Sequence, residues 1–347
     1  GVPQQTVIQS MPYHMEYLDF SEQPTPHLAA KAWMSEHSAI LFEFGKRLFD
    51  SALLKISDNQ FIWYFKIHHI ILDGWSYPLF FQKVAEFYQQ ALNGPADKPV
   101  ALPRFEDYVA YRQQMIGTSQ YLKAKAYWQN KLSQRFEPIG FYSKPSTHKG
   151  TQIHRVSYRL DNTQQLKQRA READIFRKTE NASLFNIFLA ILLTYLYRVT
   201  GQQRLSIAAP FHNRHSAFKE TIGMLMEIYP FCVTIANDET FISLIRKVAV
   251  ETSDILRHRH YTVSNPLQNR IYEVRLNYHL ISFQDFNGLP VEPEWGTTGH
   301  GLDSLVVHVQ DFGLTGHLTL MFDFHGDVFN DIQQRLAIEH FNQILEA

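Results

Sequence analysis

The sequence contains a single cysteine, Cys232, among its 347 residues. One cysteine can build neither a disulfide framework nor a cysteine-based metal site, and this usage fits a reducing compartment. The N-terminal residues, GVPQQ, include no basic stretch followed by an apolar one, so the sequence predicts no signal peptide. We therefore expect a soluble cytoplasmic protein, or a piece of one.

Strong charge of one sign and long apolar runs are also missing. Lys+Arg 33 against Asp+Glu 34 leaves a formal net charge of -1, and no basic run suggests nucleic-acid binding. The longest apolar run, residues 184–197, is broken by Asn186 and Thr194 and is too short to span a bilayer. We expect a buried helix there, and no association with a membrane.

What the chain does contain is typical of a globular protein with a large core. Hydrophobic residues make up 45% and charged residues 19% of the sequence. Strand-like and helix-like segments alternate in both halves, which favours an α/β fold in which sheets and helices form α+β sandwiches. Two prolines and two glycines fall within residues 136–150. We therefore predict a linker and two domains, residues 1–146 and 147–347.

Ionisable chemistry concentrates in residues 67–76, which read IHHIILDGWS. An apolar, aromatic stretch at 61–67 predicts a buried strand before them, and helical spacing from residue 79 predicts a helix after them, with Ser76 as its N-cap. A neutral imidazole at a strand end can take a proton near neutral pH. Gly74 frees the backbone to turn sharply and lets another group approach closely, and its N–H can face a developing oxyanion.

This loop lacks the elements of covalent and metal-assisted catalysis. No G-x-S-x-G signature occurs in the sequence, so the loop suits direct attack by a substrate's own nucleophile, helped by a histidine. A metal site of two histidines and Asp73 would have to recruit His325 or His340, and we expect none. His68 and His69 point in opposite directions along a strand, so His68 also fits a packing role. Asp73 before Gly74 is also an ordinary turn pair.

The segment HHIILDG, residues 68–74, matches the HHxxxDG motif of nonribosomal peptide synthetase condensation domains. The next two residues fit that family's continuation, and the shorter HxxxD pattern belongs to the wider chloramphenicol-acetyltransferase-like superfamily. Other segments resemble the family in the expected order: FEDYVAY at 105–111, YW at 127–128, APFHNR at 209–214, TIGM at 221–224, YPF at 229–231 and FDFHGDVF at 322–329. The resemblance covers essentially the whole chain.

The resemblance implies a fold and an activity. Two chloramphenicol-acetyltransferase-like lobes would form a V with a tunnel between them, and the N-terminal lobe would be incomplete, because the family's opening SxAQxR and RHExLRT regions do not occur. The activity implied is amide-bond formation between an acyl or peptidyl thioester and the amine of an aminoacyl thioester. Both substrates are carried as phosphopantetheine thioesters, so donor and acceptor carrier proteins and neighbouring synthetase modules are the expected partners. No bound cofactor is expected.

The resemblance also assigns roles to residues. His69 would position or deprotonate the amine, and Gly74 would lie where the thioester carbonyl reacts. His68, Asp73 and Arg214 would support the loop, with Asp73 paired to Arg214. The candidates for lining the substrate channel are Trp75, Ser76, Glu227 and Pro230.

Departures from the family pattern indicate a divergent subtype. Glu227 stands where the IGxFVN region has asparagine; it places a carboxylate near the tunnel, or else is a solvated loop residue. Residues 258–264, HRHYTVS, lack most of the HQDxPFE region. His68 argues against a cyclisation domain. The pattern resembles best a starter condensation domain, which takes a fatty or other carboxylic acyl donor.

Two other functions stay open at this point. One is an O- or N-acyltransferase of the same superfamily that uses a free acceptor or acyl-coenzyme A. The other is a non-catalytic domain that keeps the fold and recruits carrier proteins. Flanking carrier and adenylation domains in the full polypeptide would favour a condensation domain over the acyltransferase, and an intact His69, Asp73 and Gly74 argue against a non-catalytic domain.

Overall fold

The computed structural model describes residues 10–94, 102–134, 136–142, 148–172, 179–263, 271–312 and 316–347. The chain divides into two compact units. Unit 1 comprises Gly1–Ile71 with Gly296–Thr298, and unit 2 comprises Leu72–Trp295 with Gly299–Ala347. The division falls inside the HHIILDG segment, so the two ends of that segment are described with their own units. The predicted domain boundary near residue 146 lies outside the described residues.

Unit 1 holds a three-stranded sheet and one helix. Its elements are β1 (Glu16–Asp19), α1 (Pro26–Ala39), β2 (Phe49–Ser57) and β3 (Gln60–Ile67). The strands lie in the order β1-β2-β3; β1 runs parallel to β2, and β2 and β3 form an antiparallel hairpin. The turn of this hairpin falls at Asp58 and Asn59, between the two strands. The expected burial of β3 is wrong for most of the strand, because only Tyr64 is fully buried in it.

Unit 2 is built on a six-stranded mixed sheet in the order β4-β9-β8-β7-β5-β6. Its strands are β4 (Ile153–Arg159), β5 (Arg204–His212), β6 (Met226–Thr234), β7 (Val274–Ile281), β8 (Leu305–Phe312) and β9 (Thr319–His325). The β5–β7 and β7–β8 pairs are parallel, and the other pairs are antiparallel. The expected mixed α/β class is confirmed.

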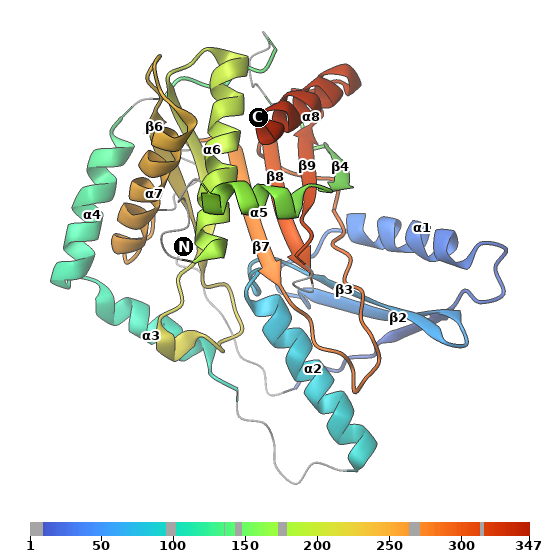
Figure 1. Cartoon of the computed structure of the whole chain (residues 1–347). Coiled ribbons are helices and arrows are strands. Elements are labelled where there is room, and N and C mark those ends of the chain that lie inside the picture. Colours follow the sequence, from blue (N-terminus) through green and yellow to red (C-terminus); the bar gives the residue numbers. More distant parts are fainter. Residues whose placement is uncertain are drawn as a thin grey trace. The chain divides into compact units, whose positions relative to one another are not determined.

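The helices of unit 2 include α6, which packs on the sheet with α7 and α8 as its neighbouring helices (Figure 1). They are α2 (Ser76–Asn93), α3 (Phe105–Met115), α4 (Ser119–Leu132), α5 (Thr163–Glu172), α6 (Glu180–Thr200), α7 (Phe241–Arg257) and α8 (Asp331–Glu346), with the short 3-10 helix η1 (Ser216–Phe218). The sheet side chains that face α6 are apolar, for example Leu276, Val307 and Phe322. Alternate residues of the same strands point to the opposite face, and several of those are polar.

Helix α6 is the core helix of unit 2. It begins at Glu180, one turn earlier than the apolar run indicates, because Thr179 accepts a hydrogen bond from the Ala182 N–H. It ends at Thr200 and is capped by Gly201, whose φ of 71° is the left-handed conformation that glycine favours. By length and composition α6 is apolar enough to cross a membrane, but 61% of that stretch is buried within the protein. Its apolar surface is therefore used for packing against the sheet.

Candidate active site

A buried ion pair fixes the loop that precedes α2. Asp73 and Arg214 both have fully buried side chains, and the pair is bidentate: Nη1 of Arg214 lies 2.7 Å from Oδ2 of Asp73 and Nη2 lies 2.9 Å from Oδ1. The backbone N–H groups of Leu225 and Met226 also donate to Oδ2, each at 2.9 Å. The contact that the resemblance implies between Asp73 and Arg214 is thus present in unit 2.

The hydrogen bonds set the charge of Asp73. Burial raises the pKa of its carboxyl, but the hydrogen bonds and charge of Arg214, together with the Leu225 N–H and the Ser76 hydroxyl, outweigh burial and hold the pKa below its ordinary value. Asp73 is therefore ionised at neutral pH, and both of its carboxylate oxygens accept hydrogen bonds from these partners. A carboxylate so engaged braces the loop and has no lone pair left for general base catalysis.

Ser76 belongs to this brace. Its hydroxyl oxygen lies 2.8 Å from Oδ1 of Asp73 and 2.7 Å from Nη2 of Arg214, and it accepts a hydrogen bond from the Gly223 N–H at 3.0 Å. The predicted N-cap role is wrong, because Ser76 is the first residue of α2 and its side chain is turned into the brace. Asp73 instead accepts the Ser76 N–H at 2.9 Å.

Gly223 allows the brace to close. Its carbonyl accepts the Asp73 N–H at 3.2 Å, and a Cβ on Gly223 would lie 2.3 Å from Cδ2 of Phe105 on α3. Any side chain there would have to displace a ring that packs on the brace. The glycine of the TIGM segment is therefore required by close approach of α3.

Gly74 lies against a histidine that the sequence does not single out. A Cβ on Gly74 would meet Cε1 of His279 on β7 at 3.4 Å, and the His279 ring stacks on Trp295 at 5.9 Å. Gly74 lies within a turn, as predicted, although its φ is not positive. The predicted close approach to Gly74 is made by the His279 ring, which would be in van der Waals contact with a Cβ at this position.

Trp75 links the loop to the end of β5. Its indole N–H donates to the Lys219 carbonyl at 3.0 Å, and its ring packs on His212 with centroids 4.4 Å apart. Burial lowers the pKa of His212, and the positive charges of Arg214 and Arg259 lower it further. His212 is therefore neutral at neutral pH, and the indole, 42% exposed, packs on an uncharged ring.

His68 and His69 belong to unit 1 and have different surroundings. The His68 ring packs edge-on against Phe44 with centroids 5.2 Å apart, and its Nδ1 accepts the Ile70 N–H at 3.1 Å. His69 is exposed, at the first position of the turn that follows β3. Within the described part of unit 1, His68 is thus engaged in packing and loop support, while the His69 ring makes no hydrogen bond.

Glu227 and Pro230 both lie on β6 of unit 2. Pro230 is buried opposite Ala208 of β5. Glu227 is not a solvated loop residue: its side chain is 12% exposed, its Oε1 accepts the Thr262 hydroxyl at 2.9 Å, and it lies 3.4 Å from Nη2 of Arg112. The negative charge of Glu227 is therefore compensated by the positive charge of Arg112.

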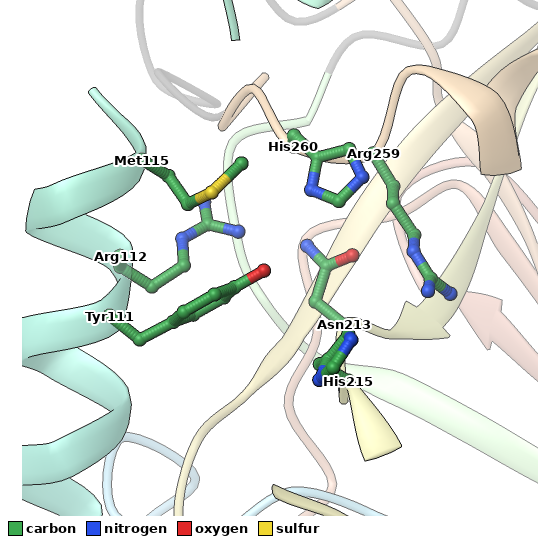
Figure 2. Close-up of a pocket in the computed structure, with 7 residues that line it drawn as sticks. All are labelled: Tyr111, Arg112, Met115, Asn213, His215, Arg259 and His260. Carbon is green, nitrogen blue, oxygen red and sulfur yellow. The ribbon is translucent and has the colours of Figure 1, made fainter. Parts of the chain in front are cut away.

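A basic pocket lies beside this pair (Figure 2). Its lining comes from α3, from the residues after β5 and from those after α7: Tyr111, Arg112, Met115, Asn213, His215, Arg259 and His260. Burial lowers the pKa of His260, and the charges of Arg259, Arg112 and His215 lower it further. The potential in the pocket is therefore positive. Asn213 and His215 flank Arg214, so the pocket adjoins the brace.

A second buried polar network crosses the sheet face that points away from α6. Arg155 on β4 donates two hydrogen bonds to Asp323 on β9, from Nε to Oδ1 at 2.6 Å and from Nη2 to Oδ2 at 2.7 Å. Nε2 of His308 on β8 lies 3.0 Å from Asp323, and Nδ1 of His308 lies 3.2 Å from Nδ2 of Asn277 on β7. Because an amide nitrogen can only donate, Nδ1 accepts and Nε2–H donates to Asp323. Burial lowers the pKa of His308, so the ring is neutral and its tautomer is fixed.

A family model named Condensation domain matches residues 1–347, the whole chain. The chain belongs to the condensation domain family. The structure adds no metal centre to this family assignment: among the described residues, no group of three or more His, Cys, Asp or Glu side chains is placed to hold a metal ion.

Curated relatives of this condensation domain are nonribosomal peptide synthetases. The chain is 25% identical to surfactin synthase subunit 1 of Bacillus subtilis (strain 168), matching 100% of this chain and 10% of the relative. It is 24% identical to the isonitrile lipopeptide synthase of Streptomyces coeruleorubidus, matching 95% of this chain and 23% of the relative. The chain thus spans between a tenth and a quarter of the length of these relatives.

Solved condensation domains have the same fold. A starter condensation domain of rhizomide synthetase RzmA, in a mutant form bound to C8-CoA, has a TM-score of 0.80 at 22% identity and matches 97% of this chain and 79% of that one. The first condensation domain of the calcium-dependent antibiotic synthetase, bound to a substrate analogue, has a TM-score of 0.78 at 19% identity, over 96% of this chain and 75% of that one. At this identity the likeness concerns the fold.

The polar network predicts a specific acid sensitivity for this condensation domain. Burial raises the pKa of Asp323, but Arg155 and His308 outweigh it and lower the pKa from 3.8 to about 2. A depressed carboxyl pKa stabilises the folded state above pH 4, and this stabilisation is lost as the pH falls from about 4 to 2. The shift corresponds to about 2 kcal/mol. We expect urea denaturation midpoints of the wild type to fall across this window.

Asp323→Asn provides the comparison for that measurement, because an amide does not titrate. Its midpoints are expected to vary less between pH 4 and 2 than those of the wild type. Asp58→Asn, at a carboxylate with 92% of its side chain exposed, is expected to keep the wild-type pH dependence. Equal slopes in the wild type and Asp323→Asn would contradict the assignment.

Proposed function

We propose that this chain forms an amide bond between an acyl or peptidyl thioester on a donor carrier protein and the amine of an aminoacyl thioester on an acceptor carrier protein. The observation that carries the proposal is the buried Asp73–Arg214 pair. It braces an intact HHIILDG segment in a chain of the condensation domain family. The pair holds Asp73 and the adjoining Gly74 in one position, and a reaction at this loop requires such fixed geometry.

The proposed roles follow the motif. His69 positions or deprotonates the acceptor amine, and Gly74 is the position at which the donor carbonyl reacts. His68, Asp73 and Arg214 support the loop, and the contacts described above favour these supporting roles. Ser76 joins them, because its hydroxyl is buried in the brace. Trp75, Glu227 and Pro230 stay candidates for the substrate channel.

The donor we propose is a fatty or other carboxylic acyl group, as in a starter condensation domain. Support comes from the similarity to a starter condensation domain that was solved with C8-CoA and to a lipopeptide synthase. The carrier proteins and neighbouring modules are proposed partners, because the curated relatives are much longer than this chain. The phosphopantetheine arms of those carriers would bring both substrates. The division into lobes at residues 1–146 and 147–347, with a tunnel between them, belongs to the same proposal, as does a cytoplasmic location.

A two-carrier assay separates this function from its alternatives. The synthetase polypeptide that contains the chain would receive an acyl group on its donor carrier and an amino acid on its acceptor carrier, and in parallel acyl-coenzyme A with free amino acid. We expect amide product on the acceptor carrier and at most traces from the free substrates. Product from the free substrates alone would indicate a superfamily acyltransferase, and no product in either arm would indicate a non-catalytic domain.

A further inference from the structure

The sheet face that carries the buried polar network of unit 2 continues to Gly74. On β7, Arg275, Asn277 and His279 point to this face, because strand side chains alternate. The His279 ring is the group that a Cβ on Gly74 would touch, at 3.4 Å. Gln310 on β8 is the register partner of His279. Gln310 and Asn277 therefore lie on the same sheet face as His279, and both are its near neighbours.

The network leaves one acceptor unused on this face. The Asn277 amide is held by its bond to His308, which is itself held by Asp323 and Arg155. These hydrogen bonds hold Nδ2 of Asn277 against His308. Because the side-chain amide is planar, they also fix the direction of Oδ1. That oxygen, Oδ1, is buried and has no hydrogen-bond partner in the described part of the protein.

Gln310 supplies an unused donor on the same face. The residue is only 3% exposed, and Nε2 has no hydrogen-bond partner among the described residues. Asn277 pairs in register with His308, two residues before Gln310, so the two amides lie diagonally on adjacent strands. Strand spacing and rise put their Cα atoms roughly 8 Å apart, a separation that the two side chains can span.

The chemistry of these atoms defines what they can bind. Buried polar groups are almost always paired in folded proteins, and an unpaired one lowers stability. An amide nitrogen needs an acceptor and an amide oxygen needs a donor. A hydroxyl or an amide offers both, whereas a carboxylate would face the Asn277 oxygen unfavourably and an ammonium group the Gln310 nitrogen. A hydrocarbon would satisfy neither atom.

We propose that Asn277 and Gln310 bind a hydroxyl or amide group of the substrate on the sheet face beside Gly74, and that Arg155, Asp323 and His308 position Asn277 for this contact. The inference rests on the proposed condensation function and narrows its substrates. The bound group can come from the donor, as a β-hydroxyl on the acyl chain, or from the acceptor, as a side-chain amide. Both residues would then determine specificity rather than the bond-forming step itself.

The test measures the ratio of the rates of amide formation with a polar and an apolar substrate of the same size class. The synthetase polypeptide would receive donor carriers loaded with octanoyl or β-hydroxyoctanoyl groups, each against acceptor carriers loaded with leucine or asparagine. The wild type is expected to favour the polar member of one of these pairs about tenfold, the usual effect of satisfying a buried hydrogen-bonding group. The pair that shows the preference identifies the source of the bound group.

The variants are chosen to remove one bond at nearly constant volume. Gln310→Met and Asn277→Leu are each expected to lower the preference ratio to near one. His308→Leu, at a positioning residue, is expected to lower the ratio in the same pair. Gln334→Leu is the matched control: this buried glutamine lies on α8 and donates to the Phe329 carbonyl, and its ratio should stay at the wild-type value.

Thermal denaturation supplies a second readout for Gln310. Because Nε2 has no partner, Gln310→Met is expected to keep or raise the wild-type midpoint without substrate; a fall of several degrees would mean that the amide already has a structural partner and would overturn the proposal. An unchanged preference ratio in folded Gln310→Met and Asn277→Leu would also overturn it, with amide product still formed. Absence of amide product from every pair would instead overturn the condensation function, and this inference with it.

Discussion

Replacing Asp73 by alanine is expected to destabilise unit 2 by about 3–5 kcal/mol, the usual effect of removing one partner from a buried ion pair. The variant would leave the Arg214 guanidinium buried without its counter-charge. It would also leave the N–H groups of Leu225 and Met226 without their acceptor. Because small proteins are stable by only about 5–15 kcal/mol, soluble yield and the thermal midpoint should both fall steeply.

Two controls separate this effect from a loss of surface charge. Asp58→Ala removes an exposed carboxylate and should leave the midpoint nearly unchanged. The double variant Asp73→Leu with Arg214→Met removes both charges and should recover a large part of the stability lost in Asp73→Ala. A soluble Asp73→Ala protein with a wild-type midpoint and no activity would assign Asp73 to the chemistry instead of to the brace.

Replacing His69 by alanine is expected to lower the rate of amide formation at least about 100-fold, the usual worth of general acid–base assistance. The folded structure should be retained, because the side chain is exposed and surface substitutions change stability by about 0.5 kcal/mol or less. Single-turnover rates with loaded donor and acceptor carriers would measure the first effect, and thermal denaturation the second.

His68→Ala is the informative neighbour for this comparison. It removes a ring that packs on Phe44 and accepts the Ile70 N–H, so its main effect should be on the stability of unit 1. We expect a smaller loss of rate than in His69→Ala and a larger drop in midpoint. A larger loss of rate in His68→Ala and a larger drop in midpoint in His69→Ala would instead assign the chemistry to His68 and the supporting role to His69.

Local features of the site are accessible from the sequence. The apolar stretch before His68 and the helical spacing after residue 79 place the HHIILDG segment between β3 and α2, where the structure has it. The pairing of Asp73 with Arg214 is implied by the two family segments that contain them. These predictions succeed because they depend on short-range patterns or on motif segments that match as units.

Features that depend on long-range packing are not accessible in this way. Ser76 has the sequence context of an N-cap, but its hydroxyl bonds to Gly223, 147 residues later. His279 and Gln310 lie in ordinary strand patterns, and only the parallel pairing of β7 with β8 brings them side by side. The sequence indicates that Gly74 lets another group approach closely, but not that this group is the His279 ring of β7.

Intact mass measurement of the acceptor carrier is the most direct test of the central claim. The donor carrier would be loaded with an isotopically labelled acyl group and the acceptor carrier with an amino acid. The intact mass of each carrier would be measured before and after a single turnover. The proposed function predicts that the acceptor carrier gains the labelled acyl mass, that the donor carrier loses it, and that His69→Ala slows the transfer. Loss of the label to water or free amine, with no gain on the acceptor carrier, would contradict it.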